Sequence, residues 1–343
     1  DHAFFNDASA VTEALGQRVD GVFLDKLSVL PETDSRELLL QSVTGMEDIF
    51  ETYDTGELAD FYAEVVAQSP TAVSWMIWKY SLLADRVAHL AQTDAAMDLY
   101  AGPATHGSHQ FLFGTLLRAI LCESAILAML GTLYLSGYEG MCCTEEVTLS
   151  SRTGRKLRRV KALAALPPSM AFYGLLALCT LIPYFLLYDY SGIWGASVSS
   201  QFNYYSDMLF VRPFLTWGDF TVSGYLTAAF LLGAMLTAVF SLLASLCGTL
   251  VHSPYRAALV LGGVCFGGLG LTFALGELGW WTAYLLSCFQ PTIICLSCSA
   301  WFTELGLTAV LPWQETLAVG LNATLLGGGT ILTLRRFDRK DVA

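Results

Sequence analysis

Residues 145–163 read EEVTLSSRTGRKLRRVKAL, and they lie between two long apolar stretches. Six of the chain's 18 basic residues fall within Arg152–Lys161. Lysine and arginine accumulate in the short cytoplasmic loops of membrane proteins, close to the ends of the spanning helices. The pattern therefore predicts a loop on the inner side of a membrane, with a spanning helix on each side of it.

The composition agrees with a chain that is largely embedded in lipid. Of its 343 residues, 54% are hydrophobic and 14% are charged, whereas about 25% of the residues of a soluble domain are charged. A helix of about 20 apolar residues is long enough to cross the hydrocarbon core. We therefore expect an all-α, polytopic membrane protein, with spans at about 110–137, 162–188, 219–250, 257–276 and 313–334.

The first 108 residues differ from the rest in charge. They contain 18 acidic and 5 basic residues, against 12 acidic and 13 basic residues in the remaining 235. Apolar positions recur at helical spacing within 36–50, and Ser69 followed by Pro70 is a favourable helix start. These features predict a mostly helical, acidic extracytoplasmic domain over 1–108 and a transmembrane domain over 109–343.

Basic residues also mark the inner ends of the later spans. Arg256 lies in 251–256, and four more basic residues lie in 335–343. One arrangement of five spans places both segments, the C-terminus and the loop at 138–161 in the cytoplasm. The same arrangement places residues 1–108 outside.

A sixth apolar stretch, residues 280–300, complicates this count. If it crossed the membrane, the basic C-terminal tail would lie outside together with the acidic domain. We therefore expect 277–312 to form a re-entrant or surface hairpin on the outer side, broken at Gln290-Pro291. Irregular backbone at membrane depth is tolerated where it is packed within protein.

The charges of the inner loop are ordered, with acids at its N-terminal end and bases at its C-terminal end. Contact with lipid headgroups would explain the bases alone, while the ordered pattern favours a surface that docks another protein. The stretch YEGMCCTEEVTLSSRTGRKLRRVKALAAL and the tail RRFDRKDVA resemble ABC-2 type transporter permeases, over roughly 109–343. In that family an acidic stretch leads through a Ser/Thr-rich turn to Gly-Arg, and a lysine opens the next span.

The resemblance implies the membrane subunit of an ATP-driven exporter in a bacterial cytoplasmic membrane. Its partners would be a separate ATPase subunit, a second permease copy, identical or related, and membrane lipid. Such permeases have six spans, so the resemblance implies that the first span is missing from this sequence. The ATPase would dock on residues of the inner loop and the second short inner segment: Glu139, Glu145, Glu146, Gly154, Arg155, Lys156, Arg158, Arg159, Lys161 and Arg256.

No G-x-x-x-x-G-K-[ST] motif is present in the sequence. ATP and Mg are therefore expected to bind to the partner subunit. The chain itself is expected to be no enzyme, with no catalytic residue, metal, cofactor or nucleic acid of its own.

Two charged residues, Arg118 and Glu123, fall within the first span. A charge at the centre of a membrane helix costs about 2.5 kcal/mol or more, so such residues tend to face protein or a water-filled path. They are candidates for an intramembrane polar path, with structural pairing as the alternative. Because five residues separate them, they do not lie squarely on one helix face.

Other motifs have simpler interpretations. Cys295-x-x-Cys298 suits membrane packing more than thiol redox chemistry, because it lies in an apolar run. His106-x-x-His109 lies in a Gly-rich linker with no third metal ligand nearby. Gly263-x-x-x-Gly267 has the spacing of helix packing in membranes, and the sequon at Asn322 lies inside a span.

Two further functions stay open at this point. The chain could be a membrane sensor or anchor, whose outer domain binds a ligand and whose basic loop recruits a signalling protein. It could also be a membrane thiol oxidoreductase that uses Cys295 and Cys298.

Overall fold

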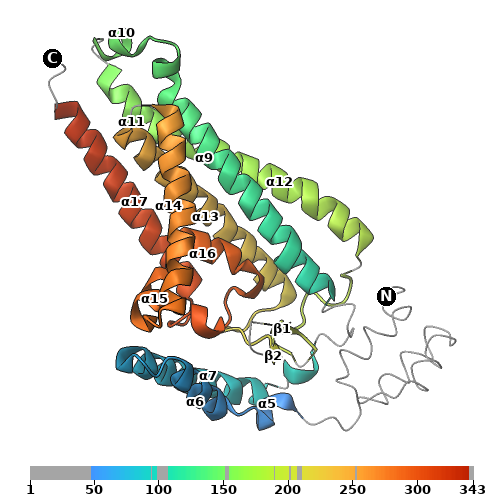
Figure 1. The fold of residues 1–343 in the computed structure, drawn as a ribbon. Coiled ribbons are helices and arrows are strands. Elements are labelled where there is room, and N and C mark those ends of the chain that lie inside the picture. The colour runs from blue at the N-terminus through green and yellow to red at the C-terminus, as the bar shows by residue number, and fades with distance from the viewer. Residues whose placement is uncertain are drawn as a thin grey trace. The chain divides into compact units, whose positions relative to one another are not determined.

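The computed structural model describes residues 48–93, 95–98, 107–150, 154–188, 190–200, 202–206, 211–251 and 253–339. The chain divides into two compact units. Unit 1 comprises Asp1–Thr115, Tyr184–Thr227 and Ser299–Pro312, and unit 2 comprises Leu116–Pro183, Ala228–Cys298 and Trp313–Ala343. Both units are mainly helical (Figure 1).

Within the described residues, five helices are long and apolar enough to cross a membrane. This confirms that the chain is a multi-pass, helical membrane protein. The spanning segments are Gly107–Met141, Leu157–Leu187, Val222–Leu250, Pro254–Glu277 and Gln314–Arg336. Their main helices are α9 (Leu117–Met141), α12 (Leu166–Leu187), α13 (Val222–Leu250), α14 (Pro254–Glu277) and α17 (Gln314–Arg339). A π-helical segment, η2 (Gln110–Leu116), leads into α9.

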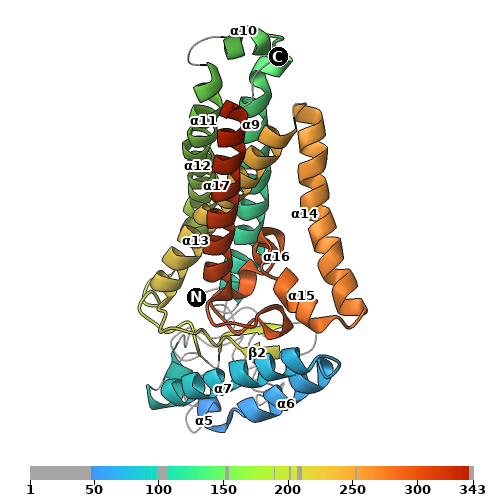
Figure 2. The ribbon, with the colours of Figure 1, turned by 90° about the vertical axis from the view of Figure 1, so that its left-hand side faces the viewer.

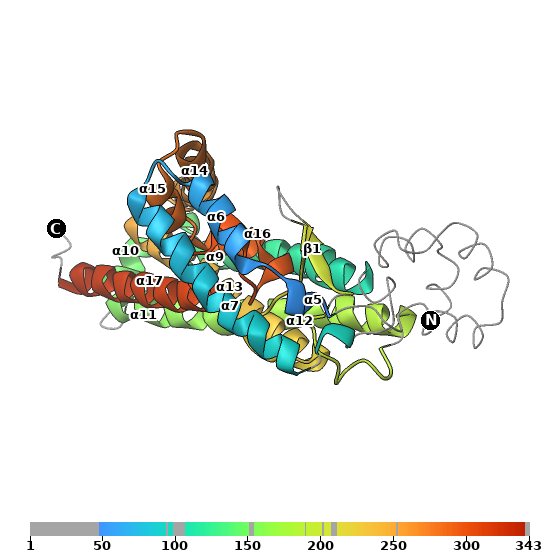
Figure 3. The same ribbon diagram turned by 90° about the horizontal axis from the view of Figure 1, so that it is seen from below.

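The first described helices of unit 1 are α5 (Ile49–Thr52), α6 (Thr55–Val65) and α7 (Pro70–Gln92), and η1 (Ala95–Met97) follows them. Figure 3 shows α6 and α7 side by side. The Asp54 carboxylate accepts hydrogen bonds from the first amides of α6, and the Ser69 hydroxyl accepts one from Ala72 N at 3.3 Å. Pro70 occupies the first position of α7, so the helix start expected at Ser69-Pro70 is confirmed.

The other segments of unit 1 come from much later in the sequence. Strands β1 (Tyr204–Ser206) and β2 (Val211–Pro213) pair antiparallel, and Thr216 forms an isolated bridge with Thr303. The Trp217 amide donates to Phe302 O, and its indole Nε1 donates to Thr303 O, both at 2.8 Å. Residues that precede the first span are therefore folded into one unit with residues that precede the third and fifth spans.

In unit 2, helix α9 pairs with α13 through small and hydroxyl side chains. Ser124 bonds to Thr237 at 3.1 Å and Thr132 bonds to Ser241 at 2.8 Å, and all four side chains are buried. Interhelical hydroxyl bonds of this kind help to hold membrane helices together because the bilayer offers no competing water.

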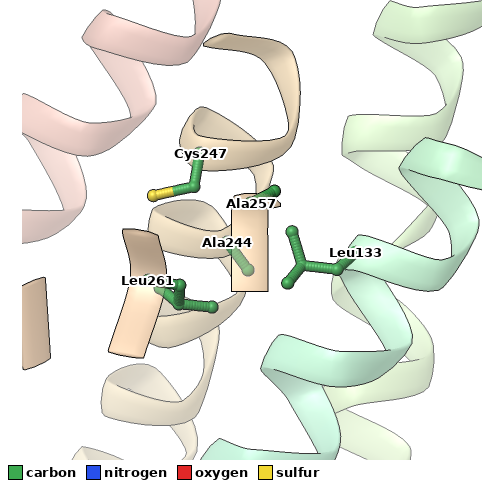
Figure 4. Close-up of a cluster of buried hydrophobic side chains, with 5 residues drawn as sticks. All are labelled: Leu133, Ala244, Cys247, Ala257 and Leu261. Atoms are coloured by element: carbon green, nitrogen blue, oxygen red, sulfur yellow. The ribbon is translucent and has the colours of Figure 1, made fainter. Parts of the chain in front are cut away.

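A buried apolar cluster then joins these two helices to α14 (Figure 4). Its members come from α9, α13 and α14, and they are Leu133, Ala244, Cys247, Ala257 and Leu261. The two members from α14, Ala257 and Leu261, lie in the N-terminal half of this helix, which begins at Pro254. It therefore attaches the beginning of α14 to the rest of unit 2.

The stretch after α14 is broken into short elements. Helix α15 (Trp281–Ser287) ends before the turn at 288–290, and α16 (Pro291–Leu296) begins at the proline. Gln290 has an extended backbone, with φ −70° and ψ 146°, as residues before proline prefer. The 3-10 turns η3 (Cys298–Ala300) and η4 (Gly306–Thr308) follow. The segment is thus a pair of short helices, and its entry into the bilayer from the outer side stays a prediction.

Candidate functional site

The predicted docking loop is helical over most of its described length. Helix α9 continues to Met141, and α10 (Glu145–Ser150) and α11 (Gly154–Ala164) follow it. A turn separates α9 from α10, in which Cys143 has a left-handed backbone with φ 55°. Figure 1 shows α10 at one end of unit 2, next to the end of α9.

Glu139 and Lys161, two of the predicted docking residues, bind each other. The Lys161 Nζ donates to the Glu139 carboxylate and, at 2.7 Å, to Leu135 O in the last turns of α9. The side chains of Lys161 and Glu139 are 12% and 18% exposed. The cation also suits the negative end of the α9 helix dipole. These two residues therefore fasten α11 to α9.

The other docking residues vary in exposure. Glu146, Arg159 and Arg256 are exposed and Arg158 is half-buried. The backbones of Glu145, Gly154, Arg155 and Lys156 lie in α10 and α11, but their side chains are outside the described residues. Apolar side chains lie exposed on the same two helices, at Val147, Val160 and Leu163. The loop thus presents acidic, basic and apolar side chains on its surface.

The two predicted inner segments lie next to each other. Pro254, the first residue of α14, contacts α9 so closely that a Cβ added to Gly137 would overlap with its ring. Gly137 is two residues before Glu139, which fastens α11. The arrangement therefore places the 251–256 turn beside the base of the α10–α11 segment, within unit 2.

The charged residues of the first span lie on α9, and both Arg118 and Glu123 are exposed on the surface of this chain. Arg118 lies close enough to the thiol of Cys298 to interact with it electrostatically. Glu123 lies in a row of exposed side chains with Ile126 and Leu130. The Glu123 side chain therefore points away from the packed interior of the chain.

A buried ionic cluster in unit 1 was missed by the sequence analysis. The Lys79 side chain is fully buried and its Nζ donates to Gly306 O at 2.6 Å, Ala309 O at 3.2 Å and the Glu304 carboxylate at 3.4 Å. Arg212 donates to the same carboxylate and to the Tyr62 hydroxyl. The cluster ties together the three sequence segments that form unit 1.

The Glu304 carboxylate is the centre of this cluster. Besides the two cations it accepts a hydrogen bond from the Tyr80 hydroxyl at 3.0 Å and from Gly306 N at 2.8 Å. A buried charge is stable only when it is paired and hydrogen-bonded, and Glu304 meets both conditions. One signal in the sequence was available, because Arg212 lies outside the segments that carry the other basic residues of the second half.

A small open cavity of about 210 Å³ also lies within unit 1. Its lining includes Asp98, Gly195, Asp219 and Phe220. Both acids are engaged by the chain itself, since Asp98 accepts from Ser197 N at 2.9 Å and Asp219 binds Arg86 at 2.6 Å and His89 at 3.2 Å. The hydrogen bond from Arg86 lowers the pKa of Asp219 below its usual value.

The described cysteine and histidine residues of the two sequence motifs have the surroundings of packing residues. Cys295 and Cys298 are buried. His109 packs among the rings of Phe113, Phe214 and Tyr225, and His106 lies outside the described residues. In the part of the chain that the structure describes, no group of three His, Cys, Asp or Glu residues could hold a metal ion.

Comparison with known proteins gave no relative. No family model matches the sequence, and neither a curated protein nor a solved structure matches it.

Proposed function

We propose that this chain is the membrane subunit of an ABC-2 type exporter and that a separate ATPase drives it. One observation carries the proposal. The α10–α11 segment and the 251–256 turn lie together at one end of unit 2, and Lys161 fastens the segment to α9. A partner that binds there would hold a surface that is directly connected to the membrane helices.

The connections explain how force would reach the membrane. Movement of α11 would pull on α9 through Lys161, and α9 is bonded to α13 through Ser124–Thr237 and Thr132–Ser241. Movement of the 251–256 turn would act on α14 directly, because Pro254 is its first residue. ATP binding and hydrolysis in the partner would in this way alternate the side on which a path between two permease copies is open.

The ionic cluster of unit 1 supports the proposed topology. Lys79 precedes the first span and Glu304 follows the fourth, yet the two side chains are in contact. Both must therefore lie on the same side of the membrane, which requires an even number of crossings between them. The four spans supply that number, and a fifth crossing at 280–300 would separate the two residues by about 30 Å of hydrocarbon.

This count supports a proposed topology in which the unit 1 segments lie on one side of the membrane and the basic segments on the other. The basic segments follow the first, third and fifth spans, and the enrichment of basic residues assigns them to the cytoplasm. We therefore propose a bacterial cytoplasmic membrane with residues 1–108 outside and the C-terminus inside.

Reversing the charges at the start of the docking segment tests the proposed function. In the variant with Glu145→Lys and Glu146→Lys, we expect loss of at least about 90% of the ATPase that co-purifies, because opposed charges become like charges at the contact. The spans should still insert, since no apolar residue is changed. Co-purification from native membranes, with identification of the bound proteins by mass spectrometry, measures the effect.

A matched control variant changes the net charge by the same amount, but on α6 of unit 1. Glu57 and Glu64 are exposed on α6 in unit 1, and the variant with Glu57→Lys and Glu64→Lys should retain the ATPase. Equal amounts of ATPase with both double variants would contradict docking at α10.

The alternative function, a sensor or anchor, draws support from the cavity at Asp98 and Asp219 in unit 1. Here the cavity would receive a ligand and the basic segment would recruit a signalling protein. The same co-purification separates the two functions, because a kinase or regulator would be found in place of an ATPase with a phosphate-binding loop.

A further inference from the structure

The turn between α15 and α16 is bonded to α14 by a single side chain. The carboxamide Nε2 of Gln290 donates to Gly268 O at 3.0 Å and to the Thr272 hydroxyl at 2.5 Å. The Thr272 hydroxyl in turn donates to Gly268 O at 3.2 Å. Gln290 therefore occupies a site on α14 that consists of one carbonyl and one hydroxyl, a single turn apart. Figure 2 shows α15 and α16 beside the later part of α14.

The same turn is bonded on its other side to α17. The Asn322 Nδ2 donates to Phe289 O at 2.8 Å, and it also donates to Ala318 O of its own helix at 2.8 Å. Phe289 and Gln290 are adjacent in the sequence. Two amide side chains therefore hold two consecutive residues of the α15–α16 turn. Gln290 bonds the turn to α14, and Asn322 bonds it to α17.

The shape of α14 is matched to Gln290. A Cβ added to Gly268 would overlap with the Gln290 carboxamide. By contrast, a Cβ added to Gly262, Gly263 or Gly267 would meet no atom within 4 Å. Only glycine allows the side chain of Gln290 to approach the α14 backbone at position 268.

Helix α14 is attached to unit 2 at its beginning and along its later part. The beginning contacts α9 through Pro254 and through the cluster of Leu133, Ala257 and Leu261. The later part contacts the hairpin through Gln290 and through Tyr284, whose ring would be 3.3 Å from a Cβ at Gly276. Between these attachments, large side chains such as Phe266 are exposed. Because a helix is stiff along its axis, a displacement of α14 at one attachment also displaces it at the other.

We propose that Gln290 and Asn322 are positioning residues that couple the hairpin of α15 and α16 to α14, so that a shift at the 251–256 turn moves the hairpin. The proposal rests on the proposed function for its purpose, since that function assigns the 251–256 turn to the ATPase contact. The coupling itself is a property of this chain, and its test needs no partner protein.

The test measures amide hydrogen exchange of the hairpin in the full chain, reconstituted in lipid nanodiscs. The variant Gly137→Ala forces Pro254 away from α9, and Gly131→Ala is its control, because a Cβ there meets no atom within 4 Å. We expect Gly137→Ala to raise exchange of residues 284–296 several-fold, and Gly131→Ala to leave it unchanged. Peptides of α13 report whether the whole unit has loosened.

Removal of the positioning side chain completes the test. Gln290→Met keeps the size of the side chain and removes its hydrogen bonds, and we expect about tenfold faster exchange of the hairpin. In that background Gly137→Ala should have no further effect on the hairpin. If Gly137→Ala left the hairpin unchanged in the wild-type background, or if it added its full effect to Gln290→Met, the coupling would be overturned. Neither result depends on an ATPase, so failure of the coupling and failure of the proposed function are distinguishable.

Discussion

At the scale of single residues, one carboxylate organises much of unit 1. Glu304 is 2% exposed and pairs with both Lys79 and Arg212, which are 0% and 3% exposed. Removing one member of a buried ionic group lowers the free energy of unfolding by more than the intact group adds to it. The reason is that the remaining charges stay buried without a partner. The stability of unit 1 therefore depends on all three charged residues being present.

We expect Glu304→Gln to destabilise the protein by about 3–5 kcal/mol, because two buried cations lose their counter-ion. The thermal unfolding of the purified chain in detergent measures this change. Asp60 is exposed on α6, and Asp60→Asn serves as the control for loss of one negative charge. Equal unfolding temperatures for the two variants would contradict a central role of Glu304.

The pair of Arg86 and Asp219 predicts a small dependence of stability on pH. Because the folded state lowers the pKa of Asp219 from 3.8, the contact stabilises the fold at neutral pH. This contribution is lost as the pH falls through the lowered pKa. Asp219 is 69% exposed, so the effect should be at most about 1 kcal/mol. The unfolding temperatures of wild type and Asp219→Asn should differ at pH 7 and converge in strong acid; a constant difference would contradict this.

At the scale of elements, the glycines of α14 lie in two kinds of surroundings. Gly268 contacts the Gln290 side chain. By contrast, a Cβ added to Gly262, Gly263, Gly267 or Gly270 would meet no atom within 4 Å. Glycine within a helix costs about 0.5–1 kcal/mol relative to alanine. The same substitution at adjacent positions should therefore have opposite effects.

We expect Gly268→Ala to destabilise the chain, because the added methyl group displaces Gln290 and breaks its two hydrogen bonds. Gly267→Ala should be neutral or stabilising by up to about 1 kcal/mol, through helix propensity. Thermal unfolding of both variants in the same lipid or detergent gives the comparison. A greater loss of stability for Gly267→Ala would show that its face is covered by another chain in the membrane.

At the scale of the whole molecule, the chain contributes to unit 1 from three places separated by spanning helices. A unit of this kind requires that its segments lie on one side of the bilayer. The observed contact between Lys79 and Glu304 therefore limits which apolar segments can cross. This limit and the positions of the basic residues both support the proposed topology.

The topology predicts which cysteines a membrane-impermeant maleimide can reach in intact cells. Gln92 is the exposed last residue of α7, and a cysteine introduced there should react from outside. The native Cys142 and Cys143 are exposed beside α10, and they should react only after the membrane is opened. The reverse pattern of labelling would overturn the proposed orientation.

Short stretches of the sequence are enough to predict the features that depend on neighbouring residues. Apolar length predicted the spans, Ser69-Pro70 predicted the start of α7, and Gln290-Pro291 marks where α15 and α16 separate. Each follows from hydrophobicity or backbone geometry over a few residues. The contacts of Lys161 with Glu139, and of Lys79 with Glu304 225 residues away, are visible only in the folded chain. A charged residue in a sequence shows that a partner is needed, but folding decides which distant residue becomes that partner.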